Sequence, residues 1–201
     1  MWATAAHMCL VRTWLVVLAA HCLCCATASG PANMLKPSSP FLETDAPLFE
    51  DGVDLISDPE GLSGRWAEDW NREMHERVQR SDVIALLVVN TLTTDVSPEQ
   101  RRTHRLVTEV GDTLKGKYQG ELALASAEDS IGFDSVDRER GNVLKRTLIV
   151  FVKWTRDSAG IVRPKWHLAA GSKTIINAVR MEIAGGGGSD SVNEVLIEHN
   201  R

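Results

Sequence analysis

The histidines are the side chains of this sequence best suited to chemistry near neutral pH, because imidazole changes its charge between about pH 5 and pH 8. His104 and His167 each lie in a segment that we predict as a strand, so pairing of those strands would bring the two imidazoles together. With Asp112 or Glu109 they would supply the nitrogen and oxygen atoms of a metal site or a general base. His104 and His167 are therefore candidate metal ligands, although we favour the interpretation that they are ordinary polar residues of a sheet surface.

Familiar catalytic motifs are absent from the sequence. His75 begins a His-Glu pair, but the second histidine of the zinc-protease motif HExxH would fall at position 79, where Gln79 stands. There is no GxSxG nucleophile motif, and the glycines of residues 185–189 have no strand-to-helix turn around them that would make a phosphate-binding loop. We expect no cofactor, and we favour a non-catalytic protein over an enzyme.

Four tryptophans are the most conspicuous group of large side chains. Trp66 and Trp70 are one helical turn apart, and Trp154 and Trp166 flank a predicted hairpin turn. As candidate binding residues, Trp66, Trp70, Trp154 and Trp166 would form an aromatic patch for a peptide or a sugar. The alternative, which we prefer, is that the helical tryptophans simply pack on the sheet.

All four cysteines lie in the first 25 residues, within the pattern of an export signal. A short apolar run over residues 14–20 precedes a small-x-small cleavage site that ends at Ala28, so residues 1–28 are predicted as a signal peptide. Alternatively a cysteine carries the lipid of a bacterial lipoprotein, although no candidate follows the small residue that such sites use. The candidates are Cys22, Cys24 and Cys25. In either case we expect an extracytoplasmic protein that is periplasmic, anchored to a membrane by lipid, or secreted.

Size and charge limit the remaining possibilities. Cleavage after Ala28 would leave 201 − 28 = 173 residues, which is one ordinary domain, and these residues contain no cysteine for a disulfide. The net charge of −5 argues against a nucleic-acid partner, since such proteins are normally basic. We therefore expect an envelope protein or a small ligand as the partner, and membrane contact only through a lipid anchor.

The chain divides into four predicted parts. After the signal peptide, residues 29–62 are predicted as an extended, proline-rich acidic leader; the carboxylates between residues 43 and 60 do not have the spacing of a calcium loop. Residues 63–184 are predicted as a single globular domain. Residues 185–201 are predicted as a glycine-rich flexible tail.

Periodicity predicts the elements of that domain. A helix over residues 63–80 would be capped by Ser63, and a second helix over residues 172–184 by Ser172. Residues 104–115 suit either a strand or a helix that a capping box at residues 97–100 would start; Gly111 favours the strand. The other predicted strands are residues 83–92, 121–125, 148–154 and 161–168, and short helical turns are predicted within 134–144. Pro164 predicts that its strand lies at an edge or is bulged.

These elements predict an α+β fold: a small, mostly antiparallel β-barrel or sheet with one helix before it and one after it. Residues 81–154, which include SDVIALLVVNTL, HRLVTEVGDTLKG, ELALAS and LIVFVKW, resemble the tissue-inhibitor and netrin-like modules. That resemblance implies a five-stranded OB-type barrel. It does not imply protease inhibition, because those modules depend on disulfides and an N-terminal cysteine that the predicted mature chain does not have.

The whole chain is also similar to uncharacterised exported bacterial proteins that are predicted lipoproteins, through stretches such as DGVDLISDPEGLSGRW and KWHL. That group implies no activity. Our leading hypothesis is an exported envelope protein that acts non-catalytically through protein contacts. The alternatives are a ligand-binding module that uses the tryptophan patch, and a metal-dependent hydrolase that uses His104 and His167.

Overall fold

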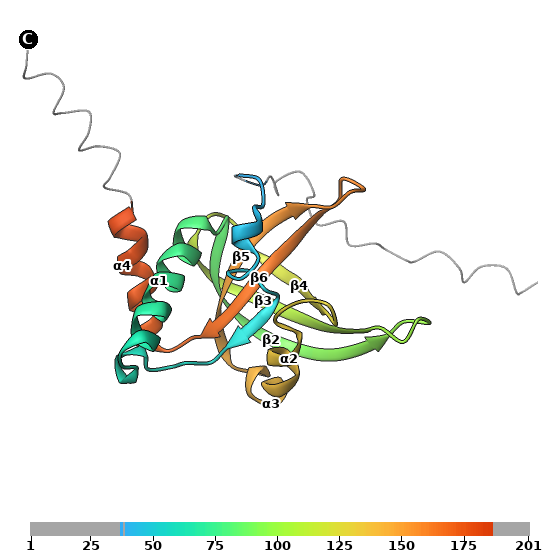
Figure 1. The fold of residues 1–201 in the computed structure, drawn as a ribbon, viewed down its shortest axis with the longest axis horizontal. Coiled ribbons are helices and arrows are strands. Elements are labelled where there is room, and N and C mark those ends of the chain that lie inside the picture. The colour runs from blue at the N-terminus through green and yellow to red at the C-terminus, as the bar shows by residue number, and fades with distance from the viewer. Residues whose placement is uncertain (1–36, 38, 187–201) are drawn as a thin grey trace, which may run out of the picture. The chain divides into compact units, whose positions relative to one another are not determined.

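The structure is a computed structural model that describes residue 37 and residues 39–186. The predicted signal peptide with Cys22, Cys24 and Cys25, and residues 187–201 of the predicted tail, lie outside the described residues. The described residues form six strands and four α-helices (Figure 1). In chain order the elements are the 3₁₀ turn η1 (Glu43–Asp45), β1 (Gly52–Asp54), the 3₁₀ turn η2 (Pro59–Gly61), α1 (Arg65–Arg80), β2 (Val83–Val96), β3 (Arg102–Lys115), β4 (Gly120–Ala127), α2 (Phe133–Arg138), α3 (Arg140–Val143), β5 (Thr147–Arg156), β6 (Val162–Ala170) and α4 (Lys173–Gly186).

The six strands form one sheet in the order β1-β6-β5-β2-β3-β4. Only β1 and β6 are parallel, and every other neighbouring pair is antiparallel. The predicted α+β class and mostly antiparallel sheet are therefore confirmed. Of the two predicted forms, a barrel or a sheet, the structure has the sheet: β1 and β4 remain the two edges of an open sheet in the described part of the chain, and an OB-type fold is not confirmed.

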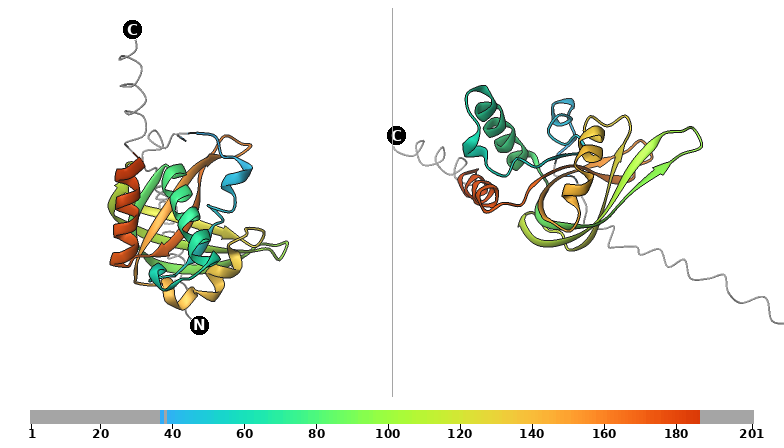
Figure 2. Two further views of the ribbon diagram at one scale, coloured as in Figure 1. Left: turned by 60° about the vertical axis from the view of Figure 1, so that its left-hand side comes forward. Right: turned by 90° about the horizontal axis from the view of Figure 1, so that it is seen from below.

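Side chains and a helical segment, rather than a strand ladder, link the two ends of this sheet. The sheet curls strongly in both views of Figure 2. The indole Nε1 of Trp166 on β6 donates a hydrogen bond to the carbonyl oxygen of Ala125 on β4, at 3.1 Å. The backbone N–H of Gly132, just before α2, donates to the carbonyl oxygen of Glu50, just before β1, at 2.9 Å. The curvature of a barrel is thus present without the closing hydrogen bonds between strands.

The core lies on both faces of the sheet. On one face α2 and α3 contribute Val136 and Val143 to a cluster that includes Trp154 and Trp166. On the other face α1 and α4 cover a second cluster, whose members include Met74, Val78, Phe151, Ile175 and Val179. β2 and β5 supply residues to both clusters, which explains why their sequences are almost continuously apolar.

The structure places much of the predicted acidic leader inside the fold. Leu48, Phe49 and Val53 are buried, and β1 pairs with β6. The two buried aspartates of this segment have basic partners: Asp45 pairs with Arg80 of α1, and Asp51 pairs with Lys165 of β6. Buried apolar residues and neutralised carboxylates together make the segment part of the domain, although its prolines are typical of a linker.

The helices and strands follow the periodicity of the sequence closely. The segment 104–115 is a strand, as Gly111 indicated, and residues 97–100 form a turn with Gln100 at φ 64° rather than a helix cap. Ser172 accepts a hydrogen bond from the backbone of Ile175 at 3.3 Å, which confirms its capping role. Ser63 is not a cap: α1 begins after Gly64, whose φ of 59° sets the chain direction.

Pro164 sits at a place where β6 can tolerate it. It faces Trp154 of β5, whereas β1 pairs with β6 only from His167 to Ala169. The prediction of an edge therefore holds for the first half of β6 and not for the second. A proline has no N–H for a second ladder, and at this position no strand of the described sheet requires one.

Candidate functional site

His104 and His167 lie on opposite faces of the sheet, and two strands, β5 and β2, separate β3 from β6. His104 on β3 stacks on Phe133 of α2, with ring centroids 4.2 Å apart. His167 on β6 packs instead against Phe151, which belongs to the cluster beneath α1 and α4. Neighbouring residues of a strand point to opposite faces, so Trp166 and Leu168 enter the other cluster. The two histidines are not brought together as the predicted metal site requires.

The hydrogen bonds of His104 determine which of its nitrogens carries the proton. Nδ1 lies 2.9 Å from Thr94 Oγ1 and 3.3 Å from a guanidinium nitrogen of Arg140. Arginine can only donate hydrogen bonds, so Nδ1 must accept, and the neutral ring carries its proton on Nε2. A second proton on Nδ1 would displace Arg140 from the imidazole.

The buried environment of His104 includes a serine but not a working nucleophile–base pair. Ser126 lies directly opposite His104 across β3 and β4. Its Oγ and His104 Nε2 are buried and have no hydrogen-bond partner among the described residues. Asp137 lies beyond hydrogen-bond reach, 3.8 Å from Nε2. With its histidine 1% exposed and its serine fully buried, the cluster offers no reacting group to a substrate at the surface.

His104 is held between β3 and α2 by a stack of three side chains. The guanidinium of Arg102 lies 5.0 Å from the Phe133 ring centroid, and His104 packs in parallel on the same phenyl ring. Arg102 is itself bound by Glu128, through both its side chain and its backbone N–H. The stack anchors α2 to β3 and fixes the imidazole.

The electrostatics of this cluster keep the imidazole neutral. Burial lowers the pKa of His104, and the positive charge of Arg140 lowers it further. Asp137 acts in the opposite direction, and Arg102 adds a further lowering. The unfolded chain has none of these constraints and binds the proton near pH 6.5.

We therefore expect the free energy of unfolding to fall as the pH drops below about 6.5, because the unfolded state then binds more protons at this position than the folded state. The variant His104→Gln keeps an acceptor for Arg140 but cannot titrate, so its loss of stability on acidification should be smaller. Urea unfolding at about pH 7.5 and about pH 5 checks this. An equal loss in both proteins would show that His104 does not contribute. The pKa of His167 is lowered as well, so part of the pH dependence of the unfolding free energy should remain in His104→Gln.

His167 is a buried structural residue. It is 2% exposed, and its Nδ1 lies 3.5 Å from Glu50 Oε1 but has no hydrogen-bond partner in the described chain. Burial lowers the pKa of His167, and the charge of Arg77 acts in the same direction, against Glu50 and Asp54. Burial alone would raise the pKa of Glu50, but His167 and Arg77 hold it below its ordinary value.

The four candidate tryptophans do not form one patch. Trp66, at the start of α1, is 78% exposed, and Trp70 is partly buried against the cluster under α1 and α4. Trp154 and Trp166 are buried on the other face of the sheet. In the hairpin Trp154 faces Pro164, so the two tryptophans are diagonal rather than direct neighbours. Trp154 stacks instead on Tyr118, with ring centroids 5.9 Å apart.

Sequence reasoning missed most of the residues that surround the candidates. Thr94, Phe133 and Arg140 contact His104 from β2, α2 and α3, and no local pattern in the sequence joins these segments. The proposed helpers Asp112 and Glu109 are exposed on β3. Residues 39–186 contain no group of three His, Cys, Asp or Glu side chains that could hold a metal ion.

A search for membrane-spanning helices and comparisons with known proteins complete the description of this chain. No helix in the described residues combines the length and apolar character needed to cross a membrane. The sequence matches no known family model, and no curated protein is significantly similar to it.

Proposed function

We propose that this chain is an exported envelope protein that acts without catalysis, by binding another protein through the end of the β2–β3 hairpin. We name residues 95–102 the hairpin tip. The observation that carries the proposal is the length of this hairpin: its ladder continues as far as Val96 opposite Arg102, although Val96 is 58% exposed and adds nothing to the core. The hairpin extends past β4 and α2 in Figures 1 and 2.

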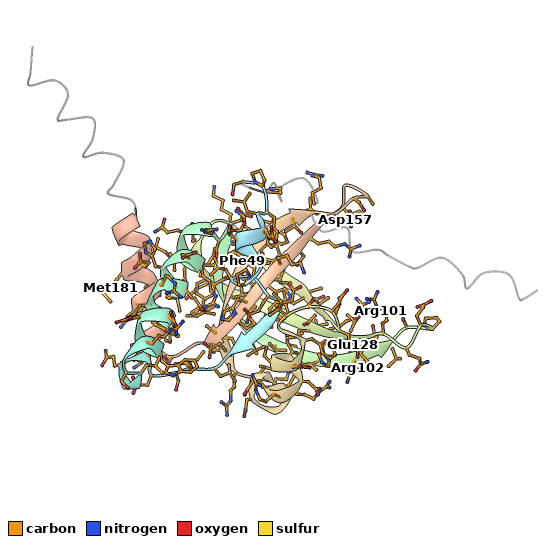
Figure 3. The ribbon with its side chains drawn as sticks, in the orientation of Figure 1. Phe49, Arg101, Arg102, Glu128, Asp157 and Met181 are labelled. Carbon is orange, nitrogen blue, oxygen red and sulfur yellow. The ribbon has the colours of Figure 1, made fainter. Side chains whose placement is uncertain are left out.

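The ion pairs in and beside the hairpin tip are exposed, so their charged side chains could instead pair with those of another protein. Arg101 pairs with Asp129, and both side chains are 68% exposed. Asp95 and Arg105 form a second exposed pair across the two strands. Exposed ion pairs contribute only about 0–1 kcal/mol each, so a partner's charges can replace them at little cost. Figure 3 shows Arg101 and Arg102 side by side with Glu128 at this end of the molecule.

The second hairpin of the fold ends in a turn bonded in the same way as the β2–β3 turn, where the backbone and hydroxyl oxygens of Ser97 accept hydrogen bonds from Gln100 and Arg101. At its turn, Asp157 Oδ1 accepts hydrogen bonds from the backbone of Ala159 and Ile161, so the turn satisfies its own polar groups. Arg163 binds the other carboxylate oxygen of Asp157 at 2.9 Å. Both turns therefore satisfy their own polar groups, so the two hairpins can be compared directly. Ile161 is 52% exposed, which makes it a matched counterpart of Val96.

A catalytic role has less support. His104 and His167 are both buried and lie on opposite faces, which removes the basis of the metal-dependent hydrolase. The tryptophan patch that a peptide or sugar would need is divided between two faces. Protein contact through an exposed hairpin is therefore the function that the geometry favours, and the proposal of export rests on the N-terminal sequence.

A photo-reactive amino acid at position 96 tests this proposal in cells that export the full chain. We expect one discrete, heavier crosslinked species in the envelope fraction for position 96, and none for the same amino acid at position 161. The charge reversals Arg101→Glu and Arg105→Glu should weaken that product together, because they oppose a complementary surface. Equal labelling at both positions, or no product at 96 in the envelope, would contradict the proposal.

A further inference from the structure

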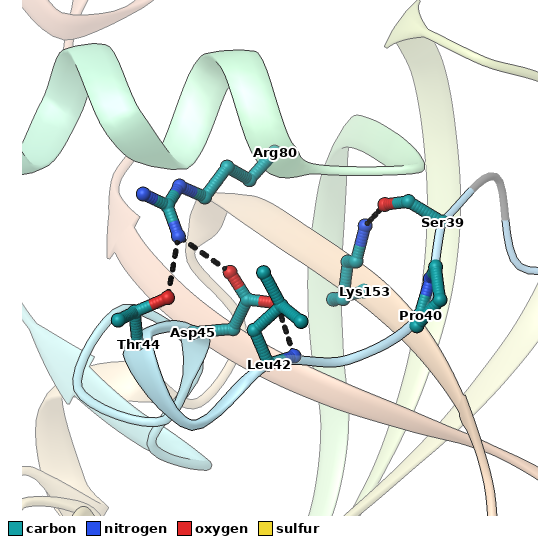
Figure 4. A pocket seen from close by; sticks show the side chains of 7 residues that line it. All are labelled: Ser39, Pro40, Leu42, Thr44, Asp45, Arg80 and Lys153. Carbon is teal, nitrogen blue, oxygen red and sulfur yellow. Dashed lines mark hydrogen bonds and ion pairs between the residues drawn. The ribbon is translucent and has the colours of Figure 1, made fainter.

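Beside the end of α1 lies a small pocket whose chemistry the hairpin proposal does not use. Its volume is about 250 Å³, and Figure 4 shows its lining. The lining residues are Ser39, Pro40, Leu42, Thr44, Asp45, Arg80 and Lys153. We name it the Lys153 pocket, and we infer that it binds a small organic carboxylate, whose charged group contacts the Lys153 ammonium and whose short chain lies against Pro40 and Leu42.

Lys153 is the unusual residue of this pocket. It is 2% exposed, so its ammonium has been taken out of water. Its Nζ donates to the hydroxyl of Ser39 at 2.6 Å, but the carboxylate nearest to it, Asp82, is 3.8 Å away. A buried charge normally requires a close, hydrogen-bonded counter-ion, and a neutral hydroxyl does not provide one.

Asp82 also interacts with groups other than Lys153. It accepts a hydrogen bond from the backbone N–H of Trp154 at 2.8 Å. Lys115, whose Nζ donates to the last carbonyls of α1, lies within electrostatic reach of both Asp82 and Lys153. Two lysines thus share the field of one carboxylate, which leaves positive charge on this side of the pocket.

The wall of the pocket that lies opposite Lys153 is held by hydrogen bonds and ion pairs of Arg80 and Asp45. Arg80 binds Thr44 and Asp45 at 3.0 and 2.9 Å, and the other oxygen of Asp45 accepts from the backbone of Leu42. Arg80 also pairs with Glu76 at 3.3 Å. The Asp45 carboxylate is therefore neutralised and fixed, and the wall keeps its shape when a ligand enters.

The size and lining of the pocket point to the class of ligand. At about 30 Å³ per water molecule, 250 Å³ corresponds to roughly eight waters, which suits an acid of a few carbon atoms. The Pro40 ring and the Leu42 side chain, which is 56% exposed, give the carbon chain an apolar surface. An inorganic anion would make no use of that surface.

The test is a titration of the full chain with sodium butyrate and, in a separate arm, with sodium phosphate at the same ionic strength, followed by amide chemical shifts. We expect saturable shifts with butyrate at Ser39, Leu42 and Thr44, and weaker or no shifts with phosphate. Lys153→Met should weaken butyrate binding by about tenfold or more, because it removes a charge-assisted hydrogen bond. Lys173→Met, which removes an exposed lysine on α4, is the control and should leave binding unchanged.

Leu42→Asp provides a variant at an exposed position, so its folding is not in question even if Lys153→Met fails to fold. The new carboxylate faces the pocket and should reduce butyrate binding by about tenfold or more through repulsion and competition for Lys153. Absence of saturable butyrate binding, binding of phosphate in preference to butyrate, or equal butyrate binding by wild type and Leu42→Asp would each overturn the inference.

Discussion

Replacing Trp166 by alanine is expected to lower the free energy of unfolding by about 3–5 kcal/mol, the largest loss among the substitutions considered for this protein. Trp166 is fully buried in the cluster between the sheet and α2–α3. Its Nε1 also donates to the carbonyl oxygen of Ala125, which links β6 to the edge strand β4. The substitution therefore leaves a cavity and removes a bond across the open side of the sheet. Urea denaturation followed by circular dichroism measures the loss.

Trp66 is the matched control for this prediction, because it is the same residue type at 78% exposure. Trp66→Ala should change the free energy of unfolding by no more than about 0.5 kcal/mol. Trp166→Phe separates the two contributions: it keeps most of the buried ring, but removes the N–H, and should cost about 1–3 kcal/mol. If Trp66→Ala and Trp166→Ala destabilised the protein equally, the described core would be wrong.

Gly132→Ala is expected to lower the free energy of unfolding by about 3 kcal/mol. A Cβ on Gly132 would overlap the backbone of Gly52, and a Cβ on Gly52 would lie 2.8 Å from Cα of Gly132. Both clashes are with backbone, which cannot rotate away as a side chain can. Hydrogen bonds join the two segments on either side of this contact. Ser135 Oγ accepts from the N–H of Val53 at 2.8 Å, and Ser130 Oγ donates to Asp51 at 3.3 Å.

Gly141 provides the comparison, since a Cβ there meets no other described atom within 4 Å. Gly141→Ala lies in α3 and should stabilise the protein by about 0.4–1 kcal/mol, because alanine restricts the unfolded chain. Opposite signs for the two Gly→Ala variants in the same denaturation experiment are the expected result. A neutral Gly132→Ala would mean that the segments before β1 and α2 do not cross as closely as described.

The elements of this fold could be predicted from the sequence because local patterns specify them. Met74 and Val78, four residues apart, predict the buried face of α1, and both are buried. The β-branched, continuously apolar run from Val83 predicts a central strand, and β2 lies between β5 and β3. Gly111 disfavours a helix, and that region is β3.

The candidate site could not be predicted in the same way. A metal site built on His104 and His167 depends on strand order and on the face to which each side chain points. A shift of one residue in a strand reverses the face, and no local pattern reports the order of strands that are far apart in the chain. The same reason separates Trp66 from Trp166, although both belong to the same predicted patch.

The sequence by itself determined the four helical segments, the five strands β2 to β6, the α+β class and the absence of cysteine after residue 25, because these depend on periodicity, turn residues and composition. Only the tertiary structure decided that the acidic segment before α1 belongs to the domain, that the sheet stays open at β1 and β4, and that Lys153 is buried beside Ser39. These depend on contacts between segments that lie 80 to 115 residues apart, such as those from Val53 to Ser135 and from Lys153 to Ser39. Their free energy comes from burial and charge pairing that exist only once the sheet has formed.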